Sequence, residues 1–182
     1  MIAGILAIVG ALGGGWLAYH AGVKQANATR NGARDQIAAL EQQNADLKLA
    51  GQRRLAQERK DVAGLLYASA GIVIAQIESA RSGLIDPLPT PRANAIRQTV
   101  GKPGFTYLWA RLGVFQGEIV AAFLSLEIAI DLMQAGKDDT DVGHLKHLLD
   151  GLSTLAERLR SLASGEMEKA KAILPADELP LR

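Results

Sequence analysis

The side chains best suited to chemistry cluster just before the last predicted helix. His144 and His147 are three residues apart, so they share one face of a helix. The acidic residues near them are Asp138, Asp139 and Asp141. Imidazole and carboxylate groups are common zinc ligands, which makes His144, His147 and Asp141 candidates for a metal site. Two exposed polar residues in a first helical turn give the same pattern, so we predict no metal and no cofactor.

A second pair of acidic residues lies within the most apolar segment of the chain. Glu127 and Asp131 are four residues apart, with Glu118 further upstream. Paired buried carboxylates can share a proton or bind a cation. The favoured interpretation is partial burial beside an arginine, because buried charges are usually paired. The arginines considered as partners are Arg81, Arg97 and Arg111.

Other catalytic motifs are missing from the sequence. There is no cysteine, which excludes a thiolate nucleophile, a disulfide scaffold and a cysteine-based zinc site. No Gly-x-Ser-x-Gly motif occurs, and the two Gly-Lys pairs lack the rest of a phosphate-binding loop. The net charge of +1 argues against a dedicated nucleic-acid binder. We therefore predict that the protein is not an enzyme and binds no nucleic acid.

Composition indicates how these residues must be positioned. Alanine and leucine make up nearly a third of the 182 residues, and aromatic residues only 4%. Alanine and leucine favour helix, whereas aromatic and β-branched residues favour strand. The sequence thus predicts an all-α protein.

The N-terminal segment 1–23 is predicted to be a transmembrane anchor. Residues 2–23 contain no Asp, Glu, Lys or Arg. As a helix they span roughly 33 Å, enough to cross a hydrocarbon core of about 30 Å. Trp16 and Tyr19 lie near the end, where aromatic rings prefer the headgroup layer, and Lys24 follows them. Basic residues after the segment, with none before it, predict a cytoplasmic C-terminal side.

Two alternatives to the anchor were weighed. A secretory signal peptide carries basic residues ahead of its apolar stretch and a small-x-small cleavage site after it, and neither is present. A buried core helix needs protein on all sides. Gly10 and Gly14 form one Gly-x-x-x-Gly pair, which lets two membrane helices approach closely, although glycine is also simply common in such helices.

Residues 24–60 are predicted to form a polar helical stalk. Ile37, Leu40, Asn44 and Leu47 follow the a-d-a-d spacing of a coiled coil, in which an asparagine at an a position fixes the register of a dimer. The pattern fails at Gly51 and covers about two heptads, fewer than the three or four that make it persuasive. A homo-oligomeric coiled coil and a single solvated helix both fit.

Residues 61–174 are predicted to form a three- or four-helix bundle. Its longer helices are expected at 61–84, 106–135 and 143–174. A proline-rich linker at 85–104 separates the first two and contains a short helix near 92–100. Thr140 or Asp141 is expected to cap the last helix, whose leucines recur every three or four residues. Residues 175–182 are expected to be a frayed tail.

In outline, the first sixty or so residues resemble bacterial inner-membrane coiled-coil proteins. They also look like the inner-membrane subunit of phage two-component spanins, whose stalk is periplasmic. We predict a single-pass inner-membrane protein whose helical domain is cytoplasmic and tethers or regulates an unknown protein partner at the lipid bilayer. The alternatives are an envelope or phage lysis factor with a periplasmic stalk, and a metal-binding helical bundle.

Overall fold

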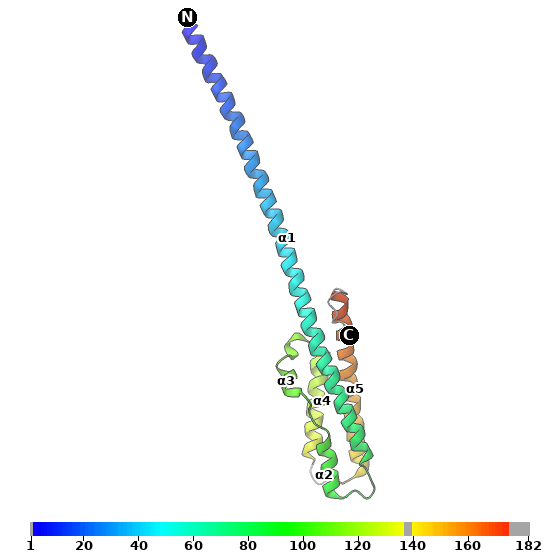
Figure 1. The fold of residues 1–182 in the computed structure, drawn as a ribbon. Helices are drawn as coiled ribbons and strands as arrows, with labels where there is room; N and C mark the ends of the chain where they lie inside the picture. The colour runs from blue at the N-terminus through cyan, green and yellow to red at the C-terminus, as the bar shows by residue number, and fades with distance from the viewer. Residues whose placement is uncertain (1, 137–139, 175–182) are drawn as a thin grey trace. The chain divides into compact units, whose positions relative to one another are not determined.

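The computed structural model describes the backbone of residues 2–136 and 140–174, and the side chains of 19–136 and 140–174. All regular structure in these residues is helical, which confirms the predicted all-α class. The helices are α1 (Ile2–Ser82), α2 (Thr90–Thr99), α3 (Phe105–Trp109), the 3-10 helix η1 (Leu112–Val114), α4 (Glu118–Ala135) and α5 (Val142–Ile173) (Figure 1). The chain divides into two compact units, 1–51 and 52–182.

The first unit is the N-terminal part of α1. No proline occurs before Pro87, and the segment after the apolar run is rich in alanine, glutamine and arginine, which favour helix. Every side chain described in this unit, from Tyr19 to Gly51, is exposed. The sequence therefore forms this helix without help from tertiary packing.

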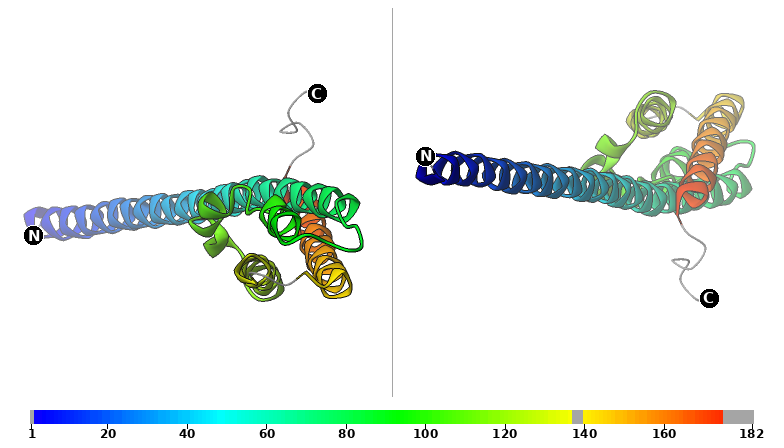
Figure 2. Two further views of the ribbon diagram at one scale, coloured as in Figure 1. Left: turned by 90° about the horizontal axis from the view of Figure 1, so that it is seen from below. Right: turned by 90° about the horizontal axis from the view of Figure 1, so that it is seen from above.

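The second unit is built around one apolar core. The C-terminal part of α1 contributes Val62, Leu66, Val73 and Ile77, which are fully buried at helical spacing. Helix α4 packs against α5, and α2 packs against α4. Figure 2 shows these helices grouped together from two sides. The remaining large buried side chains of the core include Phe105, Leu108, Phe123, Leu126, Ile130, Met133, Leu145, Leu149 and Leu159.

The proline-rich segment contains the short helix that the sequence predicts. Helix α2 begins at Thr90, two residues before the expected start, with Pro91 in its first turn. Proline suits that position because its missing N–H has no helical partner there. Ala93 and Ile96 of α2 are buried and attach the segment to the core.

The single helix predicted over 106–135 is wrong. Helix α3 ends at Trp109, η1 follows, and α4 begins only at Glu118. Gly117 adopts a φ of 68°, a left-handed conformation that favours glycine and interrupts a right-handed helix. Leu112 and Phe115 are buried as the helical pattern suggested, but Leu112 reaches the core from η1 and Phe115 from the irregular segment before α4.

One helix among the described residues is long and apolar enough to cross a membrane, the part of α1 from Tyr19 to Ser82. The longest uncharged run in that part is 62–77. This run carries the core residues of α1, so packing within the second unit accounts for its hydropathy. The side chains of 2–18 lie outside the described residues.

Candidate functional site

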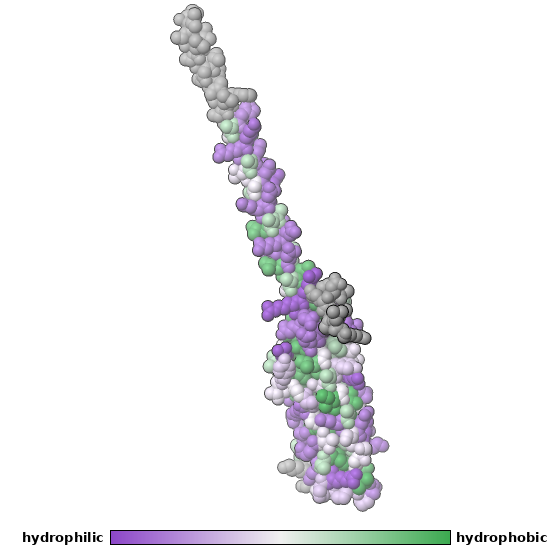
Figure 3. Space-filling view, viewed as in Figure 1, coloured by the Kyte–Doolittle hydropathy of each residue, from purple (hydrophilic) through white to green (hydrophobic). Residues whose placement is uncertain are grey.

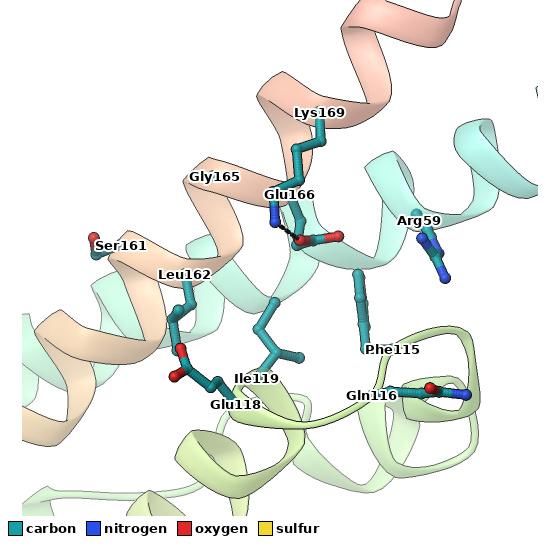
Figure 4. Close-up of a pocket in the computed structure, with 10 residues that line it drawn as sticks. All are labelled: Arg59, Phe115, Gln116, Glu118, Ile119, Ser161, Leu162, Gly165, Glu166 and Lys169. Carbon is teal, nitrogen blue, oxygen red and sulfur yellow. Dashed lines mark hydrogen bonds and ion pairs between the residues drawn. The ribbon is translucent and has the colours of Figure 1, made fainter.

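A cavity of about 420 Å³ opens where α1, the start of α4 and α5 meet in the second unit (Figure 4). Phe115, Ile119 and Leu162 form its apolar side. Its polar side chains are Arg59, Gln116, Glu118, Ser161, Glu166 and Lys169. The hollow thus combines apolar side chains with groups of both charges.

Two polar contacts shape this cavity. Arg59 Nε donates a hydrogen bond to the carbonyl oxygen of Val114 at 3.0 Å, which ties η1 to α1. Lys169 Nζ pairs with a Glu166 carboxylate oxygen at 2.6 Å, one turn apart on α5 (Figure 4). Ser161 is the only hydroxyl side chain among the lining residues, and none of them is a histidine that could activate it. The cavity is therefore better suited to binding than to nucleophilic catalysis.

A second, more apolar groove of about 450 Å³ lies between α4 and α5. Leu132 on its rim is 68% exposed. The residues that line the groove are Ala129, Leu132, His147, Leu148, Gly151, Leu152, Thr154 and Leu155. His147, a candidate metal ligand from sequence, is thus placed at the edge of an apolar surface.

The other two candidate metal ligands lie at the start of α5. Asp141 Oδ1 accepts hydrogen bonds from the backbone N–H groups of Gly143 at 2.8 Å and His144 at 3.2 Å. Asp141 is therefore the N-cap of α5, one of the two caps that the sequence predicted. Within the described residues, no group of three or more potential metal ligands comes together. Asp138 and Asp139 lie outside the described residues.

The acidic pair on α4 does not pair with the arginines considered from sequence. Lys102 Nζ contacts Asp131 at 2.6 Å and Glu127 at 3.5 Å. Trp109 Nε1 donates a hydrogen bond to Glu127 at 2.8 Å. The interpretation of partial burial fits Glu127, whose side chain is 19% exposed, whereas Asp131 is 58% exposed.

The three arginines have other contacts. Arg81 forms an ion pair with Asp150 of α5 at 2.6 Å. The guanidinium of Arg111 lies 4.8 Å from the centre of the Tyr107 ring. Arg97 is buried on α2 and donates to Asn94 within the same helix.

The cluster around Lys102 has an electrostatic consequence. The hydrogen bond that Lys102 Nζ donates to Asp131 is the main cause that raises the pKa of Lys102 above its usual value. Desolvation by burial lowers this pKa in part, and the charges of Asp131 and Glu127 raise it further. The cluster joins the loop after α2, the end of α3 and the exposed side of α4. The cluster holds these elements together. Both of its carboxylates are bonded to partners within it, Asp131 to Lys102 and Glu127 to Lys102 and Trp109.

Several contacts made by aromatic residues were not predicted from the sequence. Arg160 Nη2 donates to Tyr67 Oη at 2.7 Å, and its guanidinium lies 4.5 Å from the centre of that ring, so α5 is tied to α1. Trp109 packs edge-on against Phe123 with ring centres 5.6 Å apart. These residues follow no motif, and only the folded chain brings them together.

The residues assigned to membrane and helix association lie in α1. Trp16, Gly10 and Gly14 belong to the segment whose side chains are outside the described residues. Tyr19, Lys24 and Asn44 are exposed. Comparison with protein-family models, curated proteins and solved structures finds no match to this chain.

Proposed function

We propose that this chain is a single-pass protein of the bacterial inner membrane whose helical bundle tethers or regulates a protein partner at the bilayer. The observation that carries the proposal is the uncharged segment 2–23, which lies at the start of a helix that continues without a break to Ser82. As a helix, 22 residues cover roughly 33 Å, the thickness of a hydrocarbon core.

The residues that follow the segment support the same proposal. Tyr19 is 68% exposed, as an aromatic residue of the headgroup layer would be before lipid surrounds it. Lys24, Arg30 and Arg34 are exposed on the next turns of α1. Basic residues at this position are attracted to anionic lipid, by about 1 kcal/mol each near the surface. They also favour a cytoplasmic bundle over a periplasmic one.

The second unit supports an interaction role. Its helices surround one apolar core, and both hollows described above are lined by side chains suited to contact rather than to bond breaking. A protein held at a bilayer by one helix presents such surfaces at high local concentration to other membrane proteins.

The anchor is tested by sedimenting lysed cells without detergent. We expect the full-length protein in the membrane pellet. The double variant Ala7→Arg/Ala11→Arg should move to the supernatant, because each arginine near the bilayer centre costs about 2.5–3.5 kcal/mol. The matched control Ala28→Arg/Ala33→Arg adds the same charge outside the segment and should stay in the pellet. Full-length protein found in the supernatant contradicts the proposal.

The orientation is tested with two fusions to the C-terminus. A fluorescent protein that matures only in the cytoplasm should be bright, and an alkaline phosphatase active only in the periplasm should be inactive. The opposite pair of results overturns the cytoplasmic placement and supports an envelope protein with a periplasmic stalk.

A further inference from the structure

Four large apolar side chains stand exposed on the polar part of α1 in the first unit, and three of them share one face of the helix. Ile37 is 56% exposed, Leu40 is 59% exposed and Leu47 is 63% exposed. Figure 3 shows such apolar side chains between hydrophilic ones along this helix. Because every described side chain of this unit is exposed, none of the three is used in packing within the second unit.

The spacing of these residues matches the surface of another helix. Together with Asn44 they are separated by three, four and three residues, the a-d-a-d order of a heptad, and we call these four residues the heptad face. Ile37 and Asn44 take a positions, and Leu40 and Leu47 take d positions. A β-branched residue at a with leucine at d favours two parallel strands.

We infer that the heptad face binds a second copy of this chain as a parallel, in-register coiled coil. In that arrangement each layer pairs a residue with itself, so the two Asn44 side chains face each other and can hydrogen-bond. In an antiparallel pair, a positions face d positions, and Asn44 would meet a leucine. Its buried amide would then have no partner, which is destabilising.

The residues beside the heptad face are compatible with this pairing. In a parallel coil the g position of one helix lies next to the following e position of the other. These pairs are Gln36 with Glu41 and Gln43 with Lys48. Each joins a neutral amide to a charged group, so no like charges meet and each glutamine can donate to the carboxylate or accept from the ammonium group.

The coil has a defined end. The next a position is Gly51 and the next d position is Arg54, and two Arg54 side chains facing each other would repel. The end of the pattern coincides with the end of the first unit at Gly51. The coil therefore belongs to the part of α1 that has no tertiary contacts of its own.

A short coil of this kind is strengthened by its context. The helix already exists on both sides of the heptad face, so pairing does not have to nucleate it. Two copies inserted in one bilayer from the same end are parallel and concentrated, and this step rests on the proposed function.

Single cysteines test the pairing directly, because the chain contains none of its own. Full-length protein in detergent micelles is oxidised with each variant. Leu40→Cys and Asn44→Cys should form disulfide-linked dimers at least ten times faster than Gln42→Cys and Asp46→Cys, which lie on the opposite side of the helix. Equal rates at all four positions overturn the inference. Linkage only when Leu40→Cys and Asn44→Cys variants are mixed indicates an antiparallel pair and also overturns it.

The molecular mass of the protein in solution tests the dimer without disulfide formation. Leu40→Glu/Leu47→Glu should halve the protein mass found by light scattering with the helical circular dichroism unchanged. Leu49→Glu is the matched control, because Leu49 is 46% exposed but lies off the heptad face, and it should remain dimeric. A wild-type protein that is already monomeric overturns the inference.

The two proposals can fail separately. A protein that sediments with membranes but gives no linkage at positions 40 and 44 is anchored and does not pair through this face. A protein found in the supernatant that still links at these positions pairs without the anchor, and only the membrane assignment is then lost.

Discussion

Lys102 lies between two carboxylates of α4 in the second unit. It contacts both Glu127 and Asp131, and its pKa is raised by these carboxylates. A raised pKa in the folded state means that the ion pairs stabilise the fold fully below the ordinary lysine value of about 10.4. The stabilisation is lost as the pH rises through the raised pKa.

Replacing Lys102 tests this linkage. Lys102→Met should lower the free energy of unfolding by about 1 kcal/mol at pH 7, as expected for a partly exposed ion pair. The difference from wild type should shrink as the pH rises past about 10.4, the ordinary lysine value. Urea titrations of the full chain in mild detergent at several pH values measure it. Lys102→Arg keeps its charge and should show no such alkaline change, and a pH-independent difference for Lys102→Met would contradict the assignment.

Asp141 is a residue whose role could be predicted from its neighbours alone. Its carboxylate accepts from two backbone N–H groups at the start of α5. Asp141→Ala should lower the free energy of unfolding by about 1 kcal/mol. Asp141→Asn should lower it much less, because asparagine caps a helix as well as aspartate does. Thermal unfolding followed by circular dichroism is the measurement. Equal losses in both variants would show that the cap is not the cause.

A helix cap could be predicted from sequence, whereas the ion-pair partner of Glu127 could not. A cap depends on the next three residues, so sequence indicates it. The partner of Glu127 depends on where the loop containing Lys102 folds, and that loop was treated only as a helix breaker. The arginines seemed natural partners from charge alone, yet the side chain that the fold brings to the acidic pair is a lysine.

At the scale of elements, α5 shows how a leucine pattern is divided between core and rim. The leucines at successive a and d positions of the sequence are Leu145, Leu148, Leu152, Leu155, Leu159 and Leu162, and Leu149 lies beside them. The structure buries Leu145, Leu149, Leu152 and Leu159 fully, and leaves Leu148 and Leu155 partly buried along the apolar groove. A face this wide was indicated by the small and apolar residues beside the leucines, but the residues at its centre could not be chosen without the partner helices.

A matched pair of substitutions measures this difference. Leu149→Ala removes a fully buried side chain and should cost about 2–5 kcal/mol of unfolding free energy. Leu155→Ala, on the half-buried rim, should cost about 1 kcal/mol. Urea titration of both variants gives the comparison, and a larger loss at Leu155 would refute the assigned packing.

The break between α3 and α4 is the element that sequence did not predict. Leu108, Leu112, Phe115 and Ile119 keep a helical rhythm, and all four are buried. The same four residues are buried although the helix is interrupted, because the positive φ of Gly117 ends the segment after η1 and α4 begins at the next residue. Periodicity therefore identified which residues enter the core, but not the backbone that brings them there.

At the scale of the whole molecule, the helical class followed from composition, and the start and end of α5 were close to expectation. The uninterrupted α1 was not expected as one element, since it was divided into anchor, stalk and first bundle helix. No proline interrupts the chain before Pro87, so hydropathy changes along α1 without a change of secondary structure.

The hydrogen bond between α1 and α5 joins two residues that are synthesised at different times. Arg160 is translated 93 residues after Tyr67, the side chain to which it bonds. At 5–20 residues per second a ribosome needs roughly 5–20 s to make that stretch. For this time the apolar run 62–77 lacks the α5 side chains that share its core in the folded unit. The nascent chain therefore carries an uncovered apolar helix face until α5 has been made, and the second unit can complete its folding only then.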